Sequence, residues 1–233
     1  MSFLAKASKA QQKESSLEPA TFEKYRALIY EKSGIALPPG KEALVSARVA
    51  KRLRALMLDD HRAYLRLLKE DESGQELIQL LDAISTNVTS FYREPLHFQL
   101  LEKIVGEWRE KGQQRFRIWC AASSTGEEPY TIAMTLREVF GTAKVDARLL
   151  ATDISTKVLA RAQEGIYTEE RVKPVPKTLL NRYFDKRGPR DAPEFAVRQS
   201  LKDMVLFRRL NLATPPFPMH GPLDIVFCRN VMI

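Results

Sequence analysis

Apolar residues in the first part of the chain recur at the spacing of amphipathic helices. Apolar side chains stand three or four positions apart in segments 21–32, 41–58, 59–70 and 75–84. Gly34 follows the first segment and suits a left-handed C-cap, and Asp59 and Asp60 suit the N-terminus of the third. We therefore predict an all-α domain over residues 21–85, preceded by a flexible tail over residues 1–20.

The pattern changes at residue 86 to an alternation of short apolar runs and amphipathic segments. It predicts strands at 115–120, 147–151 and 223–228, and helices at 93–112, 127–140, 155–165 and 176–184. Such an alternation is typical of an α/β fold with a doubly wound, Rossmann-like parallel sheet. The turn-rich residues 186–193, with the apolar runs 195–198 and 205–208, predict a small antiparallel β insertion at about 186–210.

Composition changes this picture little. Hydrophobic residues make up 44% and charged residues 28% of the 233 residues, as in ordinary globular proteins. No apolar run approaches the roughly 18 residues of a spanning helix, and no signal-peptide pattern is present, so we expect a cytoplasmic protein without membrane insertion. Cys120 and Cys228 end predicted buried strands, and we interpret them as reduced core thiols in preference to the alternative of a structural disulfide.

The net charge of +8 favours an acidic partner, and the second predicted helix concentrates basic residues on one face. Its apolar face is formed by Val45, Val49, Leu53, Leu56 and Met57. Its opposite face carries Arg48, Lys51 and Arg54. This face is either a solvated surface or a basic strip that binds an acidic helix or phosphates. No nucleic-acid motif accompanies it, and no aromatic residue interrupts it.

The turn after the first predicted strand has the chemistry of a ligand-binding loop. Residues 121–126 are small, so a ligand could approach the backbone closely, and a helix N-terminus follows. The loop lacks the Gly-x-Gly-x-x-Gly pattern of dinucleotide sites. Glu127 and Glu128 would repel a pyrophosphate but attract a cationic group. They could alternatively serve only the helix dipole.

Asp153 stands at the end of the second predicted strand. A carboxylate there can accept hydrogen bonds from a ribose diol. It could instead cap the next helix, although Ser155 is available for that role. The histidines 61, 97 and 220 show no metal or triad spacing, and we expect no metal site. We interpret residues 213–218 as a rigid connection.

Several motifs together resemble one family closely. They are Asn-x-Thr-x-Phe-x-Arg at 87–93, Ser-Thr-Gly-Glu-Glu-Pro-Tyr at 124–130, Thr-Asp-Ile at 152–154, Asn-Leu at 211–212 and Phe-Cys-Arg-Asn-Val-Met-Ile at 227–233. The chain resembles the chemotaxis receptor methyltransferases (CheR), over residues 21–233. The resemblance implies an S-adenosylmethionine-dependent protein-glutamate O-methyltransferase, which converts chemoreceptor glutamates to methyl esters and releases S-adenosylhomocysteine. It implies a methyltransferase domain over residues 86–233.

The resemblance also assigns roles by motif. Asn87, Thr89 and Arg93 would line the cofactor pocket, with Arg93 also orienting the reacting groups as the catalytic residue. Glu127 would face the methionine amino group and Asp153 the ribose. The adenine would lie near the remaining motif residues, Asn211, Leu212, Arg229 and Asn230.

The resemblance names partners as well. The strip of Arg48, Lys51 and Arg54 would meet the acidic methylation helices of the receptor. The β insertion looks like the part that docks a receptor C-terminal peptide in some family members. A substrate glutamate is already ionised near neutral pH, which fits the lack of a candidate catalytic histidine.

Two further expectations concern activity. The family continues beyond the last motif with more strands, so the chain resembles a truncated member, and we expect weak or no catalysis from it. The alternative function is a non-catalytic cofactor-binding or receptor-binding module of the same fold. A basic nucleic-acid-binding protein is a third interpretation, which the missing motifs disfavour.

Overall fold

A computed structural model describes residues 17–85 and 87–231. The described residues form two compact units. One comprises residues 17–85 with Asn211–Pro215, and the other comprises Asn87–Leu210 with residues 216–231. The segment Asn211–Pro215 belongs to the first unit, in which the Asn211 side-chain amide donates a hydrogen bond to the Lys32 carbonyl over 2.7 Å.

The first unit is helical, and its helices lie where the periodicity predicts them. They are α2 (Pro19–Ser33), α3 (Glu42–Leu56), α4 (His61–Glu70) and α5 (Gln75–Ile84). Gly34 adopts φ 70° at the end of α2, and the Asp60 carboxylate accepts the Ala63 N–H over 2.7 Å at the start of α4. Both caps are those that the sequence predicts.

Two details of this unit differ from the prediction. Residues 1–16 of the predicted tail lie outside the described residues, but Leu17 is buried and α2 begins at Pro19. Residues 17–20 are therefore part of the packed unit. Met57, assigned to the apolar face, is 91% exposed, because it adopts φ 52° as the C-cap of α3 and so leaves the helical face.

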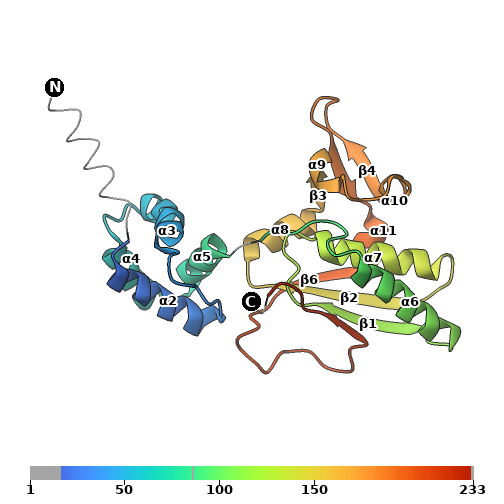
Figure 1. Cartoon of the computed structure of the whole chain (residues 1–233), viewed down its shortest axis with the longest axis horizontal. Coiled ribbons are helices and arrows are strands. Elements are labelled where there is room, and N and C mark those ends of the chain that lie inside the picture. The colour runs from blue at the N-terminus through green and yellow to red at the C-terminus, as the bar shows by residue number, and fades with distance from the viewer. Residues whose placement is uncertain (1–16, 86, 232–233) are drawn as a thin grey trace. The chain divides into compact units, whose positions relative to one another are not determined.

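The second unit is built on a parallel sheet with the order β6-β2-β1-β7. Its strands are β1 (Arg115–Cys120), β2 (Asp146–Asp153), β6 (Val205–Arg209) and β7 (Ile225–Phe227). The helices α6 (Leu96–Glu110) and α7 (Glu127–Phe140) lie side by side along one face (Figure 1). The helix α8 (Thr156–Glu164) follows β2 and is capped by the Ser155 hydroxyl, as predicted. The α/β fold class is confirmed.

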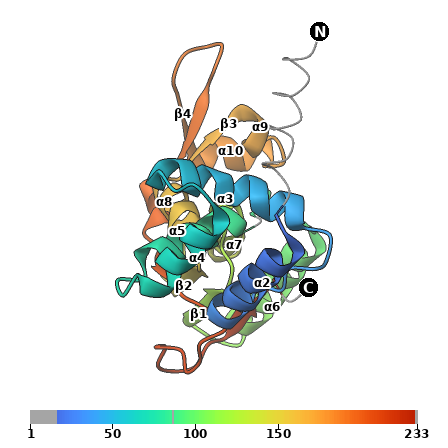
Figure 2. The same ribbon diagram turned by 90° about the vertical axis from the view of Figure 1, so that its left-hand side faces the viewer.

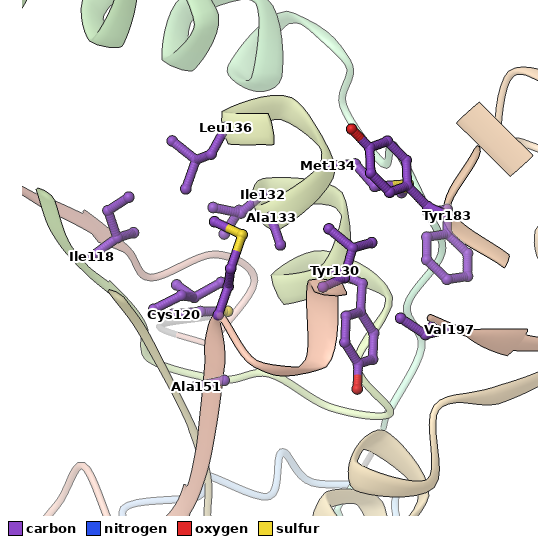
Figure 3. Packing of buried hydrophobic residues seen from close by; sticks show 14 of the residues in the cluster. Ile118, Cys120, Tyr130, Ile132, Ala133, Met134, Leu136, Ala151, Tyr183 and Val197 are labelled. Atoms are coloured by element: carbon purple, nitrogen blue, oxygen red, sulfur yellow. The ribbon is translucent and has the colours of Figure 1, made fainter. Parts of the chain in front are cut away.

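The core of this unit lies between the sheet and α7. Ile118 and Cys120 of β1 and Ala151 of β2 face Ile132, Ala133 and other buried residues of α7 (Figure 3). Both cysteines are free thiols, and burial raises the pKa of the Cys120 thiol well above its ordinary value. The interpretation as reduced core thiols therefore holds for Cys120, whereas Cys228 is only half-buried.

The small antiparallel sheet is confirmed, but its predicted bounds of 186–210 are wrong. Its order is β3-β5-β4, formed by β3 (Ile166–Thr168), β4 (Phe184–Arg187) and β5 (Glu194–Val197). The short helices α9 (Glu169–Val172) and α10 (Lys177–Tyr183) connect β3 to β4. Val205–Arg209 pairs in parallel with β2 instead. The short helix α11 (Gln199–Lys202) separates it from β5 and allows the chain to return to the main sheet.

No helix among residues 17–85 and 87–231 is both long enough and apolar enough to cross a membrane.

Candidate functional site

The loop that joins β1 to α7 lies at the carboxyl end of the parallel sheet. The Ser123 N–H donates to the Thr152 carbonyl over 2.9 Å, which ties the loop to the end of β2. The Ser123 hydroxyl is buried, and it has no hydrogen-bond partner among the residues that the structure describes. A buried hydroxyl without a partner is rare in native proteins. This hydroxyl is therefore available to hydrogen-bond a ligand that binds against the loop.

The Asp153 carboxylate bridges the two loops at this edge. One carboxylate oxygen accepts the Ser124 N–H and the other accepts the Ser155 N–H, each over 2.9 Å. Ser155 caps α8 with its own hydroxyl, so Asp153 is not needed as the N-cap. The structure thus holds a buried carboxylate at the tip of β2, where a ribose diol binds in open α/β sheets.

The Glu127 carboxylate is fully buried at the first turn of α7. One of its oxygens accepts the Thr125 hydroxyl over 2.6 Å. The other pairs with the Arg171 guanidinium of α9 over 2.8 Å. Arg171 already shares the charge of this carboxylate, so the expected binding of a further cationic group at Glu127 stays a prediction.

Gly126 is the point of closest backbone packing in the loop. It adopts φ 99°, and a Cβ atom there would lie 2.6 Å from the Tyr167 hydroxyl. That hydroxyl donates to the Thr125 carbonyl over 2.8 Å, and the Tyr167 ring packs edge-on against Phe91. The β insertion therefore fixes the loop through Tyr167.

The segment 87–93 lies beside the same loop. The Asn87 carbonyl accepts the Ser124 hydroxyl at 3.4 Å, and the half-buried Thr89 follows in the chain. The Arg93 guanidinium donates to the Val88 carbonyl over 2.9 Å. Its side chain is about one third exposed, at 38%. Arg93 thus stabilises its own segment and still reaches solvent.

Arg229 connects this segment to α7. Its guanidinium donates to the Glu128 carboxylate and to the Arg93 carbonyl, each over 2.6 Å, and lies over the Phe98 ring. Burial raises the pKa of the Glu128 carboxyl, and the charge of Arg229 opposes that shift. Arg229 also pairs with Glu94, beside which Asn230 adopts φ 55°. Arg229 therefore links Arg93 and Glu94 to the first turn of α7.

The structure therefore brings together Asn87, Arg93, Glu127, Asp153 and Arg229 through direct contacts with the 121–128 segment or with one another. Asn211 and Leu212 belong by their contacts to the helical unit. Their expected position near the adenine stays a prediction.

The three basic residues expected to meet the receptor are not equivalent. Arg48 is half-buried, and its guanidinium donates to the Ile84 carbonyl and, over 3.2 Å, to the Ser85 carbonyl at the end of α5. Lys51 and Arg54 are exposed. Arg48 therefore has a structural role that its spacing in the sequence does not reveal.

Sequence reasoning missed Arg171, Tyr167 and Ser123. Arg171 and Tyr167 approach the loop from the β insertion, about 40 residues farther along the chain. No local pattern indicates such a contact. The sequence places Ser123 within the small-residue loop, but the lack of a hydrogen-bond partner for its hydroxyl among the described residues is seen only in the folded structure. Among the described residues, no group of His, Cys, Asp and Glu could hold a metal ion.

Comparison with known proteins adds to this geometry. Residues 20–85 match the family described as "CheR methyltransferase, all-alpha domain", and residues 87–233 match "CheR methyltransferase, SAM binding domain". The chemotaxis protein methyltransferase of Escherichia coli (strain K12) is 41% identical over 218 residues, which cover 93% of this chain and 74% of that protein. The protein of that name from Borreliella burgdorferi is 40% identical over 213 residues, covering 88% and 74%. Chemotaxis protein methyltransferase 2 of Pseudomonas aeruginosa is 38% identical over 212 residues, covering 91% and 75%.

Proposed function

The chain belongs to the CheR methyltransferase family, and on this premise we propose that it methylates glutamate side chains of chemoreceptors. Its methyl donor is S-adenosylmethionine, and the resemblance inferred from the motifs is confirmed. The observation that carries the proposal is the pair Glu127 and Asp153, two buried carboxylates of which one lies in the first turn of the helix after β1 and the other ends the adjacent parallel strand β2. This pair offers partners for the ribose diol and the amino group of a nucleoside that carries an amino-acid chain.

The side chains present fit such a cofactor. Asp153 would accept hydrogen bonds from the ribose diol, and Glu127 would receive the methionine ammonium. The buried Ser123 hydroxyl provides a further polar contact. Asn87, Thr89 and Arg93 would line the pocket, with Arg229 and Asn230 close by. When bound, S-adenosylmethionine supplies a methyl group activated by a positively charged sulfur.

The proposed reaction requires no general base. A receptor glutamate is ionised near neutral pH, so no residue has to remove a proton from it. The protein has to position the carboxylate and exclude water. Arg93 suits this task because its guanidinium is partly exposed and anchored by the Val88 carbonyl. A carboxylate substrate would be oriented by such a fixed cation.

For the receptor surface we propose Lys51 and Arg54, with Arg48 beside them. Lys51 and Arg54 are exposed, and their charge complements acidic methylation helices. A receptor C-terminal peptide could add to the β insertion by strand pairing, since among the described strands β3 and β4 each have a neighbour on one side only. The first contact rests on charge and the second on an open sheet edge.

The test is calorimetric titration of the chain with S-adenosylhomocysteine. We expect saturable one-site binding that weakens by about 10-fold to 100-fold in Asp153→Asn, which loses a charge-assisted hydrogen-bond acceptor. Asp146→Asn is the matched control, because Asp146 is the exposed first residue of the same strand. Equal binding by wild type and Asp153→Asn, with both folded by circular dichroism, would contradict the ribose assignment.

A further inference from the structure

A groove in the helical unit has no role in the proposed methyl transfer. It runs between α2 and α4, which lie next to each other in both views (Figures 1 and 2). Its volume is about 480 Å³. It is lined by Lys24, Ala27, Leu28, Glu31, Arg62, Leu65, Arg66 and Lys69.

The two walls of the groove have the same spacing. On α2 the lining residues stand at positions 24, 27, 28 and 31, and on α4 they stand at positions 62, 65, 66 and 69. Each set follows the i, i+3, i+4, i+7 pattern of one helical face. Leu28 and Leu65 provide an apolar floor, and charged residues form the two rims. The groove is thus a continuous surface contributed by two regular helices.

The rims carry mainly positive charge. Glu31 is the acidic lining residue, and it already pairs with Lys32 over 2.7 Å. Arg62 pairs with Glu18 over 3.2 Å. Among the described residues, Lys24, Arg66 and Lys69 form no ion pair. Three exposed cations that form no ion pair within residues 17–85 thus flank an apolar floor, although the charge of Arg66 helps to lower the pKa of Asp60.

We propose that this groove binds an acidic amphipathic helix of a partner protein. The apolar floor matches leucine-like side chains at helical spacing, and the basic rims match flanking carboxylates. Single-stranded nucleic acid would require aromatic stacking surfaces, and no lining residue is aromatic. A membrane surface is flat on this scale, whereas the groove is concave. The occupant that fits floor and rims together is therefore a helix.

The groove is separate from the basic strip of α3. None of its lining residues comes from α3 or α5, and none belongs to the proposed cofactor site. The inference therefore does not depend on the methyltransferase reaction, and a failure of either proposal leaves the other intact.

The experiment measures fluorescence anisotropy of a labelled helical peptide with the 233-residue chain. The probe has about 18 residues, or five turns, with leucines along one face and glutamates on both flanks. We expect saturable binding at about 0.15 M salt. The double variant Arg66→Glu/Lys69→Glu should weaken it at least about tenfold, since reversed charges repel the flanking carboxylates. The matched control is Lys157→Glu/Arg161→Glu, which reverses two exposed charges of α8 in the other unit and should change the affinity less than about twofold.

A second peptide separates helix recognition from charge alone. It has the same composition, with leucines and glutamates rearranged so that no apolar face forms. Equal binding of the two peptides overturns the proposal, as does an equal loss in the α8 control variant. Binding to vesicles of anionic phospholipid without binding to the amphipathic peptide also overturns it. Circular dichroism of each variant checks the fold, and the milder Arg66→Gln/Lys69→Gln should weaken binding in the same direction.

Discussion

The Arg171 guanidinium of α9 lies 2.8 Å from the Glu127 carboxylate of α7, although 44 residues separate the two in the chain. Glu127 is fully buried at the start of α7, whereas Arg171 is about half exposed on α9 of the β insertion. The cation that neutralises the buried carboxylate is therefore contributed by the insertion. A ligand with an ammonium group would meet a carboxylate whose charge is already shared.

The first prediction concerns this pair. Arg171→Ala should lower the stability of the ligand-free chain by about 1–3 kcal/mol, because a buried acceptor loses its partner. The same change should increase the stabilisation by S-adenosylhomocysteine, because the ammonium no longer competes with the guanidinium. Thermal melts with and without the ligand measure both effects. Lys173→Ala, an exposed cation nearby, is the control. A smaller ligand-induced shift in Arg171→Ala than in wild type would show that Arg171 supports binding instead.

The second prediction concerns Gly126. Alanine there would adopt φ near 99° and would place its Cβ 2.6 Å from the Tyr167 hydroxyl and 3.0 Å from the Ala162 Cβ. We expect a loss of at least about 2 kcal/mol from strain and overpacking. Gly106→Ala is the matched control, since it lies within α6 with nothing within 4 Å of the added atom. Alanine should stabilise that position by about 0.5–1 kcal/mol. Urea titrations of both variants measure the difference, and equal midpoints would contradict this account of the loop.

The third prediction concerns how much each basic residue of α3 contributes to stability. Arg48→Ala should destabilise the chain by about 1–3 kcal/mol, because the end of α5 loses two charge-assisted hydrogen bonds. Lys51→Ala and Arg54→Ala should change stability by less than about 0.5 kcal/mol, since both side chains are exposed. Chemical denaturation of the three variants checks this. If Arg48→Ala unfolds at the wild-type midpoint, its contacts with α5 contribute nothing measurable.

The sequence predicted the elements whose signals are local. The bounds of α5, α7 and β1 agree with their periodicity, and Ser155 caps α8 because its hydroxyl needs only its own backbone neighbours. The errors arise where contacts between residues far apart in the sequence determine the position of a strand or the role of a side chain. Val205–Arg209 has the pattern of any half-buried strand, and only pairing with β2 assigns it to the main sheet. Likewise, the role of Arg48 depends on carbonyl groups 36 and 37 residues away.

The candidate site shows the same division. Glu127 and Asp153 could be found from the sequence, because each follows a predicted strand and parallel strands bring their carboxyl ends to one edge. Their contacts could not, since Arg171 stands 44 residues from Glu127. The sequence motifs therefore locate the two carboxylates, whereas only the folded structure shows which charged side chains contact them.

The last prediction concerns pH and His61 in the helical unit. Its ring nitrogen Nδ1 lies 3.3 Å from the Tyr25 hydroxyl, and burial lowers its pKa below the ordinary value of 6.5, although Asp60 opposes the shift. Below pH 6.5 the unfolded chain then binds more protons than the folded chain, so stability decreases as the pH is lowered. The contribution is fully present above pH 6.5 and is lost as the pH falls through the lowered pKa. Urea titrations followed by circular dichroism at about pH 7.5 and about pH 5.5 should show a larger loss for wild type than for His61→Gln, which has no titrating ring. Equal losses in the two proteins, or an NMR titration of His61 with a midpoint above 6.5, would contradict the prediction.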